Sequence, residues 1–355
     1  MKKFRRIGVL TSGGDAPGMN AAVRAVVRTA LSHGVEVMGI YRGYSGLIHG
    51  EIKKLELRDV SNIVNKGGTV LYSDRCPEML TAEGKALAVE NCKRFGIDGI
   101  VAIGGDGTFR GAATLTQLGV PCIGIPGTID NDITSTDNTI GYDTAMNTVI
   151  DIIDKLRDTC ESHARCNVVE VMGRGAGDIA LYAGAASGAT AVIIPEVSFD
   201  DDELCEKIKK SRALGKRNFI IVVSEGVGSA YSESLVKKIQ KETGVESKFA
   251  RLAHIVRGGT PTLRDRVLAT RMGYAAVEQL LEGNSNLVIC ERHGDVIATD
   301  IAYALLVDKM NKGISVKPEE LVKYSVEVLS AMEELVKERK REIAEMYHVA
   351  ETVNI

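Results

Sequence analysis

The sequence has no long apolar run, no paired cysteines and no excess of positive charge. No apolar stretch approaches the roughly 20 residues that a membrane-spanning helix needs, so we expect no membrane segment. Residues 1–6 lead directly into a strand-like run, and we therefore expect no signal peptide. Seven cysteines without C-x-x-C spacing support neither a disulfide framework nor a zinc site, which fits a cytoplasmic protein. The formal charge of −3 argues against general nucleic-acid binding.

Length and composition indicate a soluble globular protein with two lobes. Hydrophobic residues make up 45% of the sequence and charged residues 26%, which is ordinary for folded proteins. At 355 residues the chain is longer than one hydrophobic core usually supports. Because the net charge is slightly negative, an anionic ligand must be held by local basic residues.

Short apolar runs alternate with helix-like segments along the chain, which is typical of an α/β fold with a parallel sheet covered on both faces. The first set has predicted strands at residues 7–10, 35–41, 99–103 and 122–125, and predicted helices at 19–32, 82–95 and 108–118. A second set has a helix at 143–160 and strands at 167–171, 191–195 and 219–224, followed by a helix at 263–281 and a strand at 286–290.

The C-terminal stretch predicts one further helix, over residues 318–347. Pro318 suits the first position of a helix. An apolar stripe follows at helical spacing, formed by Leu321, Tyr324, Val328, Met332 and Leu335. The charged run 338–342 is interpreted as a solvated face. The pattern leaves open whether this helix is a lobe cap, a subunit contact or a surface helix.

Three glycine-rich loops each follow a predicted strand, at residues 12–18, 104–108 and 126–132. Glycine lets backbone N–H groups approach an anion closely, and the carboxyl ends of parallel strands line the ligand crevice of α/β proteins. One such loop alone is equally consistent with a simple turn, but three at strand ends indicate a phosphate site. The loops also carry three aspartates, whose charges would repel phosphates unless Mg²⁺ bridges them or a proton is to be removed. The pattern therefore predicts phosphoryl transfer.

The acidic residues and one arginine receive separate roles in this hypothesis. Asp106, within the second glycine turn, is the predicted metal ligand. Asp130 is the predicted base for the acceptor hydroxyl, with Thr128 and Asp132 holding it or the metal. The alternative is that the two aspartates of the third loop only cap a turn. Arg174 offers a planar guanidinium for the transferring phosphoryl group, although a surface arginine would look the same.

Five motifs together resemble those of the bacterial-type ATP-dependent 6-phosphofructokinase family, in family order and spacing over about residues 5–307. They are SGGDAPGMNA, GGDGT, PGTIDND, VVEVMGRGAGD and HIVRGG. The resemblance implies two Rossmann-like lobes with mostly parallel sheets, an active site in the cleft between them and a C-terminal helical extension. It assigns the nucleotide to residues 1–141 plus 256–305, and the sugar phosphate to residues 142–255 plus 306–355, which include the C-terminal helix.

The resemblance further implies a glycolytic kinase that uses Mg²⁺ and moves the γ-phosphoryl group of ATP to the 1-hydroxyl of fructose 6-phosphate. It assigns catalysis to Gly14, Thr128, Asp130, Asp132 and Arg174. It assigns nucleotide binding to Gly14, Arg75, Cys76, Gly105, Asp106, Gly107 and Thr108, with Asp106 on the metal. It assigns the sugar phosphate to Thr128, Ile129, Asp130, Arg165, Met172, Gly173, Arg174, Glu225, Lys248, His254 and Arg257. It also implies a homotetramer with substrate sites shared between subunits, and no membrane or nucleic-acid partner.

Several positions depart from the family pattern. Lys248 stands where the family usually has an arginine that reaches a neighbouring subunit's substrate, so the charge is kept but the bidentate fork is lost. Cys76 and Leu80 replace residues of the adenine site, which leaves GTP or a relaxed nucleotide preference open. The basic effector cluster is present as Arg24, Arg28, Arg157 and Lys216. Its usual companions are replaced by Leu57, Asn62, Thr190 and Leu214, so we expect weak effector control.

Two glycines bear on the phosphoryl donor. Relatives that use pyrophosphate carry Asp and Lys at the positions of Gly107 and Gly127, where side chains would fill the space of an α-phosphate. Glycine at both positions favours ATP. Two rival interpretations remain. NAD kinases and lipid kinases share GGDGT but lack the PGTIDND and HIVRGG motifs, and a catalytically weak regulatory or assembly paralogue would explain the altered positions but not the intact catalytic set.

Overall fold

The computed structural model describes residues 4–354 and forms two compact units. Unit 1 comprises residues up to 129, 133–144 and 257–337, and unit 2 comprises 130–132, 145–256 and the residues from 338 onward. Residues 306–337, which the sequence placed with the second lobe, pack with unit 1. The expectation about a signal peptide concerns in part residues 1–3, which lie outside the described residues.

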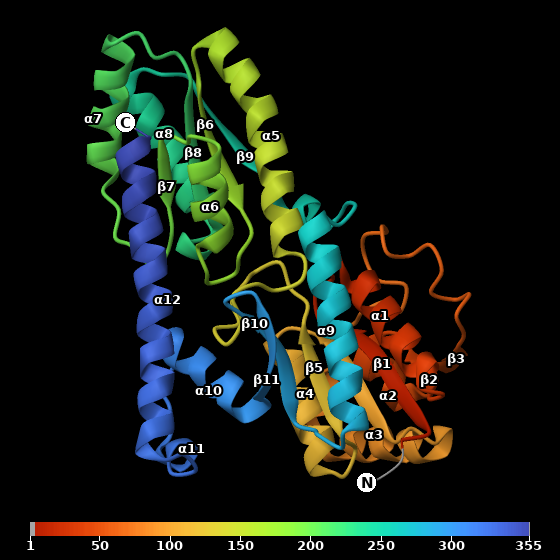
Figure 1. Cartoon of the computed structure of the whole chain (residues 1–355). Coiled ribbons are helices and arrows are strands. Elements are labelled where there is room, and N and C mark those ends of the chain that lie inside the picture. The colour runs from red at the N-terminus through yellow and green to blue at the C-terminus, as the bar shows by residue number, and fades with distance from the viewer. Residues whose placement is uncertain (1–3, 355) are drawn as a thin grey trace. The chain divides into compact units, whose positions relative to one another are not determined.

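Unit 1 is built around a seven-stranded sheet with strand order β11-β10-β5-β4-β1-β2-β3 (Figure 1). Its strands are β1 (Arg6–Ser12), β2 (Glu36–Ile40), β3 (Ile52–Leu55), β4 (Gly99–Gly104), β5 (Cys122–Pro126), β10 (Leu287–Arg292) and β11 (Asp295–Asp300). Its helices are α1 (Met19–Ser32), α2 (Gly43–His49), α3 (Ala82–Phe95), α4 (Asp106–Gln117), α9 (Leu263–Leu281), α10 (Ile301–Asn311) and α11 (Pro318–Leu321).

The strands from β10 to β2 run parallel, and only the edge strands β11 and β3 are antiparallel to their neighbours. Every residue of β4 and β5 is buried, as expected for apolar strands in a sheet covered by helices. The register pairs Ser12 of β1 with Gly104 of β4, and Gly104 with Pro126 of β5. These three strands therefore end side by side.

Helices α1 and α9 pack against each other within unit 1 through small residues (Figure 1). A Cβ at Gly273 of α9 would lie 2.6 Å from the Cβ of Ala25 and 2.9 Å from the carbonyl oxygen of Ala22. Glycine at this crossing lets the two backbones approach closely. The hydroxyl of Thr262 accepts the backbone N–H of Asp265 at 3.3 Å and so caps the start of α9.

Unit 2 contains a four-stranded parallel sheet with strand order β7-β8-β6-β9. Its strands are β6 (Cys166–Val171), β7 (Ala191–Ile193), β8 (Phe219–Ser224) and β9 (Ser247–Arg251), and its helices are α6 (Asp178–Ala186), α7 (Asp201–Ala213) and α8 (Tyr231–Thr243). Its core forms around Phe219 and Ile221 of β8, packed with Leu204 and Ile208 of α7. Two long helices, α5 (Tyr142–His163) and α12 (Val326–Val353), contribute residues to both units.

The C-terminal helix begins later than the sequence indicates. The predicted single helix over 318–347 is wrong at its start, because the short α11 ends at Leu321 and α12 begins at Val326. The hydroxyl of Ser325 accepts the backbone N–H of Val328 at 3.4 Å, which caps a new helix. The predicted apolar stripe does pack inward: Met332 is fully buried in a cluster with α10.

The predicted α/β class, the mostly parallel sheets and the C-terminal helix are confirmed. The predicted segments 19–32, 82–95, 219–224 and 263–281 coincide with α1, α3, β8 and α9. The pattern missed β3, β9 and β11, whose exposed and charged residues form no apolar run. Among residues 4–354, no helix has the length and apolar character that crossing a membrane requires.

Candidate active-site residues

The loops that follow β1, β4 and β5 meet at one edge of the unit 1 sheet. The hydroxyl of Thr108 donates to the carbonyl of Ser12 at 3.1 Å. The N–H of Gly127 donates to the carbonyl of Gly104 at 3.0 Å. A Cβ on Gly104 would lie 2.3 Å from the Ser12 carbonyl oxygen, so a larger residue would separate the loops. The glycine turns predicted to hold phosphate therefore form one continuous rim in unit 1.

The first loop, residues 12–18, is in contact with a predicted sugar-phosphate residue. The guanidinium of Arg257 donates to the carbonyl of Asp15 at 3.2 Å, and a Cβ on Gly14 would lie 2.6 Å from its Nη1 atom. The loop ends at Gly18, whose φ of 107° favours glycine and precedes the first turn of α1. The structure thus brings Gly14 and Arg257 together.

Asp106 is the first residue of α4, where free backbone N–H groups and the helix dipole favour anions. Its side chain is 20% exposed, and one carboxylate oxygen pairs with Arg110 at 2.9 Å. Mg²⁺ in phosphoryl-transfer sites is usually bound by one or two carboxylates together with phosphates and water, not by an all-protein cage. Among residues 4–354 no group of three or more acidic, histidine or cysteine side chains forms such a cage. The Asp106 carboxylate, at the glycine rim, fits this requirement.

Unit 2 holds the two aspartates of the third loop together with Arg174. The guanidinium of Arg174 lies 4.0 Å from a carboxylate oxygen of Asp130 and 3.7 Å from one of Asp132. The two aspartate side chains are only 4% and 7% exposed, whereas that of Arg174 is 59% exposed. A buried pair of carboxylates therefore faces an arginine that solvent, and hence a ligand, can reach. The structure thus brings together the three residues to which the sequence analysis assigns the base, its companion acid and the phosphoryl-binding cation.

A single carboxylate supports the Arg174 loop. Glu225 accepts the backbone N–H of Arg174 at 2.9 Å and that of Gly173 at 3.3 Å. Arg174 itself has a left-handed backbone, with a φ of 54°. Glu225, predicted to accept from sugar hydroxyls, thus has a structural contact that holds the predicted phosphoryl-binding loop.

Arg165 and Lys248 come together on either side of one acid, Glu246. Arg165 precedes β6, Lys248 lies in the neighbouring β9, and each pairs with Glu246 at 2.9 Å. Two hydrogen bonds, the stronger influence coming from Arg165 and the next from Lys248, lower the pKa of Glu246 to about 2. Sequence reasoning missed this acid. Lys248, two positions along the same extended segment, could have indicated one partner, whereas Arg165 lies 81 positions away in the sequence.

The remaining predicted residues are placed individually. Thr128 and Ile129 are buried, and the carbonyl of Thr128 accepts the hydroxyl of Thr139 at 2.6 Å. Arg75 and His254 are exposed, and Cys76 is half-buried against the unit 1 core. The other assigned positions are backbone or loop sites: Gly105 and Gly107 at the start of α4, and Met172 directly after β6.

The two donor-discriminating glycines differ in their surroundings. A Cβ on Gly107 would meet no atom within 4 Å, so a side chain there would extend into open space. A Cβ on Gly127 would lie 3.0 Å from Ile103 and 3.2 Å from Met19, which are fully buried. A lysine at position 127 would therefore disturb the core first, and only position 107 tests the donor cleanly.

Two further residues were misjudged or missed in the sequence. The pattern predicts a solvated face for the run 338–342, but Arg339 is only 13% exposed and pairs with the buried Asp178. The residues 340–342 are exposed as expected. The Arg110 partner of Asp106 could have been found, because oppositely charged residues four apart on a helix face each other.

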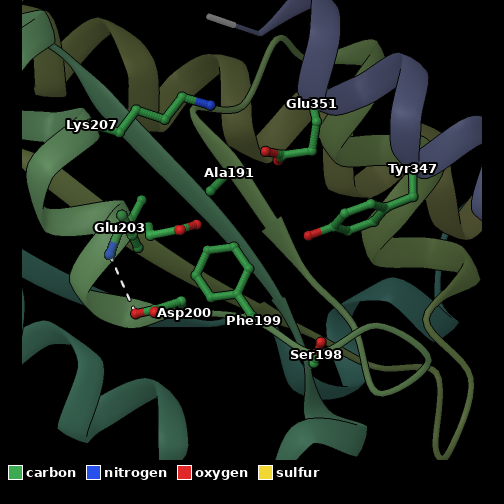
Figure 2. Close-up of a pocket in the computed structure, with 9 residues that line it drawn as sticks. Ala191, Ser198, Phe199, Asp200, Glu203, Lys207, Tyr347 and Glu351 are labelled. Carbon is green, nitrogen blue, oxygen red and sulfur yellow. Dashed lines mark hydrogen bonds between the residues drawn. The ribbon is translucent and has the colours of Figure 1, made fainter.

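A cavity of about 370 Å³ lies elsewhere in unit 2 (Figure 2). Figure 2 shows Tyr347 and Glu351 of α12 opposite side chains from the start of α7 and the segment before it. Its lining residues are Ala191, Ser198, Phe199, Asp200, Glu203, Leu204, Lys207, Tyr347 and Glu351. None of the predicted site residues lines this cavity.

Known proteins resemble the chain along most of its length. The family model described as phosphofructokinase matches residues 6–280. A curated relative from Bacillus pumilus, named ATP-dependent 6-phosphofructokinase, is 57% identical over 298 residues, which cover 84% of this chain and 93% of the relative. The relative of the same name from Bacillus subtilis is 56% identical over 302 residues, covering 85% of this chain and 94% of its own length.

A solved structure shares the fold. The structure of phosphofructokinase from Saccharomyces cerevisiae superposes with a TM-score of 0.84 at 32% sequence identity. The match covers 97% of this chain but 49% of the yeast chain, so this chain spans about half the length of that relative.

Proposed function

The chain belongs to the phosphofructokinase family, and from this premise we propose that it transfers the γ-phosphoryl group of ATP to the 1-hydroxyl of fructose 6-phosphate, giving fructose 1,6-bisphosphate. The observation that carries the reaction type is the cluster in unit 2, where Arg174 lies within 4.0 Å of the buried carboxylates of Asp130 and Asp132. Phosphoryl transfer needs an acceptor for the hydroxyl proton and a cation for the phosphoryl charge, and this cluster contains both.

Asp130 is the general base in the proposed reaction. The hydroxyl proton of the sugar passes to the Asp130 carboxylate while the hydroxyl oxygen forms a bond to the γ-phosphorus. The bond between that phosphorus and the β-phosphate oxygen breaks, and ADP leaves. Burial of the carboxylate excludes water, which keeps the base available to the sugar. Asp132 lies 3.7 Å from the same guanidinium and holds Arg174 beside the base.

Arg174 and the glycine rim bind the phosphates. The planar guanidinium of Arg174 offers a fixed positive charge to the transferring group. The backbone N–H groups of the loops at Gly14 and at Gly105–Thr108 provide neutral donors, and α4 adds its dipole. Asp106 would hold Mg²⁺, which neutralises phosphate charge during transfer. Arg110 pairs with one carboxylate oxygen of Asp106 at 2.9 Å and would share this carboxylate with the metal.

The sugar phosphate is bound in this proposal by the basic residues of unit 2 and by Arg257. Arg165 directly precedes β6 and Lys248 lies in the neighbouring β9, and the shared partner Glu246 holds the two cations close to each other. As in the family resemblance, they would serve a substrate shared between subunits of a homotetramer. Light scattering then gives the mass of four chains, and a stable, active monomer would contradict this part. Seven free cysteines agree with a reducing, cytoplasmic location.

The experiment that tests the function is a parallel assay of three donors. The purified protein receives fructose 6-phosphate and Mg²⁺ with ATP, GTP or pyrophosphate, and formation of fructose 1,6-bisphosphate is followed. Turnover with ATP should far exceed that with pyrophosphate. Equal turnover would overturn the donor assignment, and no turnover with any donor would favour the catalytically weak paralogue.

A further inference from the structure

The C-terminal helix is joined to the catalytic half of unit 2 by a buried ion pair. Arg339 of α12 pairs through its Nη2 atom with Oδ1 of Asp178, the first residue of α6. The two side chains are 13% and 3% exposed. Arg339 lies well beyond residue 280, where the match to the family model ends. The contact therefore joins a residue that follows the segment matched by the family model to Asp178, which lies within that segment.

Asp178 in turn contacts the turn that carries the predicted base. The side-chain amide of Asn131 donates to Oδ1 of Asp178 at 3.4 Å. Asn131 stands between Asp130 and Asp132, is 4% exposed and has a left-handed backbone with a φ of 51°. A side-chain hydrogen bond at a residue of this conformation fixes how the turn presents its neighbours.

The same aspartate also closes the loop of the phosphoryl-binding arginine. The segment 173–177 carries Arg174 and runs directly into Asp178. The N–H of Gly177, the last loop residue, donates to a carboxylate oxygen of Glu196 at 2.8 Å. Asp178 therefore stands at the junction of the two segments that supply the base and the cation.

Charges around Asp178 make its partner necessary. Burial raises the pKa of Asp178, nearby Asp132 raises it further, and Arg339 opposes both effects. Burial also raises the pKa of the neighbouring Glu196 and Tyr182, and Glu342 of α12 pairs with Arg339 at 3.4 Å. Without the guanidinium, an uncompensated carboxylate would lie in a buried and acidic region, which is strongly unfavourable.

We propose that Arg339 is a positioning residue for the reaction: acting through Asp178, it holds the Asn131 turn and thereby sets the placement of the Asp130 and Asp132 carboxylates. This inference rests on the proposed function for its catalytic consequence. A residue that orients a catalytic group without touching the substrate can affect kcat strongly, because a small displacement of the base slows the reaction. The C-terminal helix then supports the catalytic residues of unit 2, in addition to any role as a lobe cap.

The kinetic test replaces Arg339 by methionine, which keeps the length and apolar stem of the side chain. The kcat of Arg339→Met should fall about 10- to 100-fold, the size of effect expected from a misplaced catalytic group. The KM for ATP should change little, because the nucleotide loops lie in unit 1. Arg339→Lys keeps the charge and should restore part of the kcat. The matched control is Arg341→Met. Arg341 is an exposed arginine of the same helix and pairs with Glu345, also on α12, at 3.8 Å. An equal loss in this control would overturn the proposal.

A double-variant cycle tests whether Arg339 acts through Asp178. Asp178→Asn, Arg339→Met and the double variant are compared for kcat and for thermal stability. If the two residues form one unit, the loss in the double variant is well below the product of the two single losses. Independent, multiplying losses would mean that Arg339 acts by another route and would overturn the proposal.

A readout without catalysis separates this inference from the proposed function. Amide hydrogen exchange is measured on peptides covering residues 128–133 and 173–178 in the full-length protein. Both segments should exchange faster in Arg339→Met than in the wild type and in Arg341→Met, while the unit 1 sheet stays protected. Unchanged exchange in both segments overturns the inference whatever the activity. If the wild type does not turn over fructose 6-phosphate, the proposed function is overturned instead. The exchange data then still show whether Arg339 orders the two segments.

Discussion

At the scale of single residues, the assignment of Asp130 as the general base can be tested most directly. Asp130→Ser removes the only proposed acceptor of the hydroxyl proton, so kcat should fall by about 10²–10⁴, with a smaller change in the KM for fructose 6-phosphate. Asp154→Ser, an exposed aspartate on α5, is the matched control and should leave kcat unchanged. If Asp130→Ser retains turnover within a few-fold of the wild type, Asp132 becomes the candidate base.

A second prediction at this scale concerns the donor and uses Gly107. Gly107→Asp places a carboxylate in open space at the start of α4, where phosphates are proposed to bind, so its charge should repel ATP and raise the KM for ATP. Gly107→Ala adds only a Cβ that meets no atom within 4 Å and should behave like the wild type. Steady-state kinetics with ATP and pyrophosphate check both variants. An Asp variant with an unchanged KM for ATP would show that position 107 does not discriminate donors.

At the scale of elements, the attachment of α12 depends on its buried stripe. Met332 is fully buried with Leu306 and Val307 of α10. Met332→Ala should lower the free energy of unfolding by about 2–5 kcal/mol, because it removes buried apolar surface and leaves a cavity. Val326→Ala, at a side chain that is 79% exposed on the same helix, should change it little. Urea denaturation of the two variants measures the difference, and equal stability would mean that α12 is not anchored by this cluster.

At the scale of the whole molecule, we predict weak control by nucleotide or phosphoenolpyruvate effectors. Thr190 and Leu214 stand where the family resemblance implies charged companions of the basic cluster, and Thr190 is only 2% exposed. Arg157 is already bonded to Asn218 at 3.0 Å and to the carbonyl of Ser187. ADP and phosphoenolpyruvate should therefore change the half-saturation concentration of fructose 6-phosphate only slightly. The corresponding coupling free energy should lie below the ~1–3 kcal/mol typical of allosteric proteins. A large shift in saturation curves recorded with millimolar effector would show that other residues form the site.

The sequence by itself determined the α/β class, the inner strands of both sheets, the helices α1, α3, α4, α5 and α9, and the identity of the three glycine loops. These features are encoded in consecutive residues, because apolar runs, helical spacing and glycine turns act locally. It also indicated that the loops gather at strand ends, since parallel strands place their carboxyl ends at one edge.

Only the tertiary structure decided which distant residues meet. The pairing of Ser12 with Gly104 and of Gly104 with Pro126 depends on the strand order, which no local pattern encodes. The atoms that a Cβ at Gly127 would meet, in Ile103 and Met19, come from distant parts of the sequence that pack around it. Arg339 has the sequence surroundings of a solvated face, yet it pairs with Asp178, 161 positions earlier. Its burial follows from how α12 packs in unit 2, and that packing is a balance of many contacts that no single segment of the sequence contains.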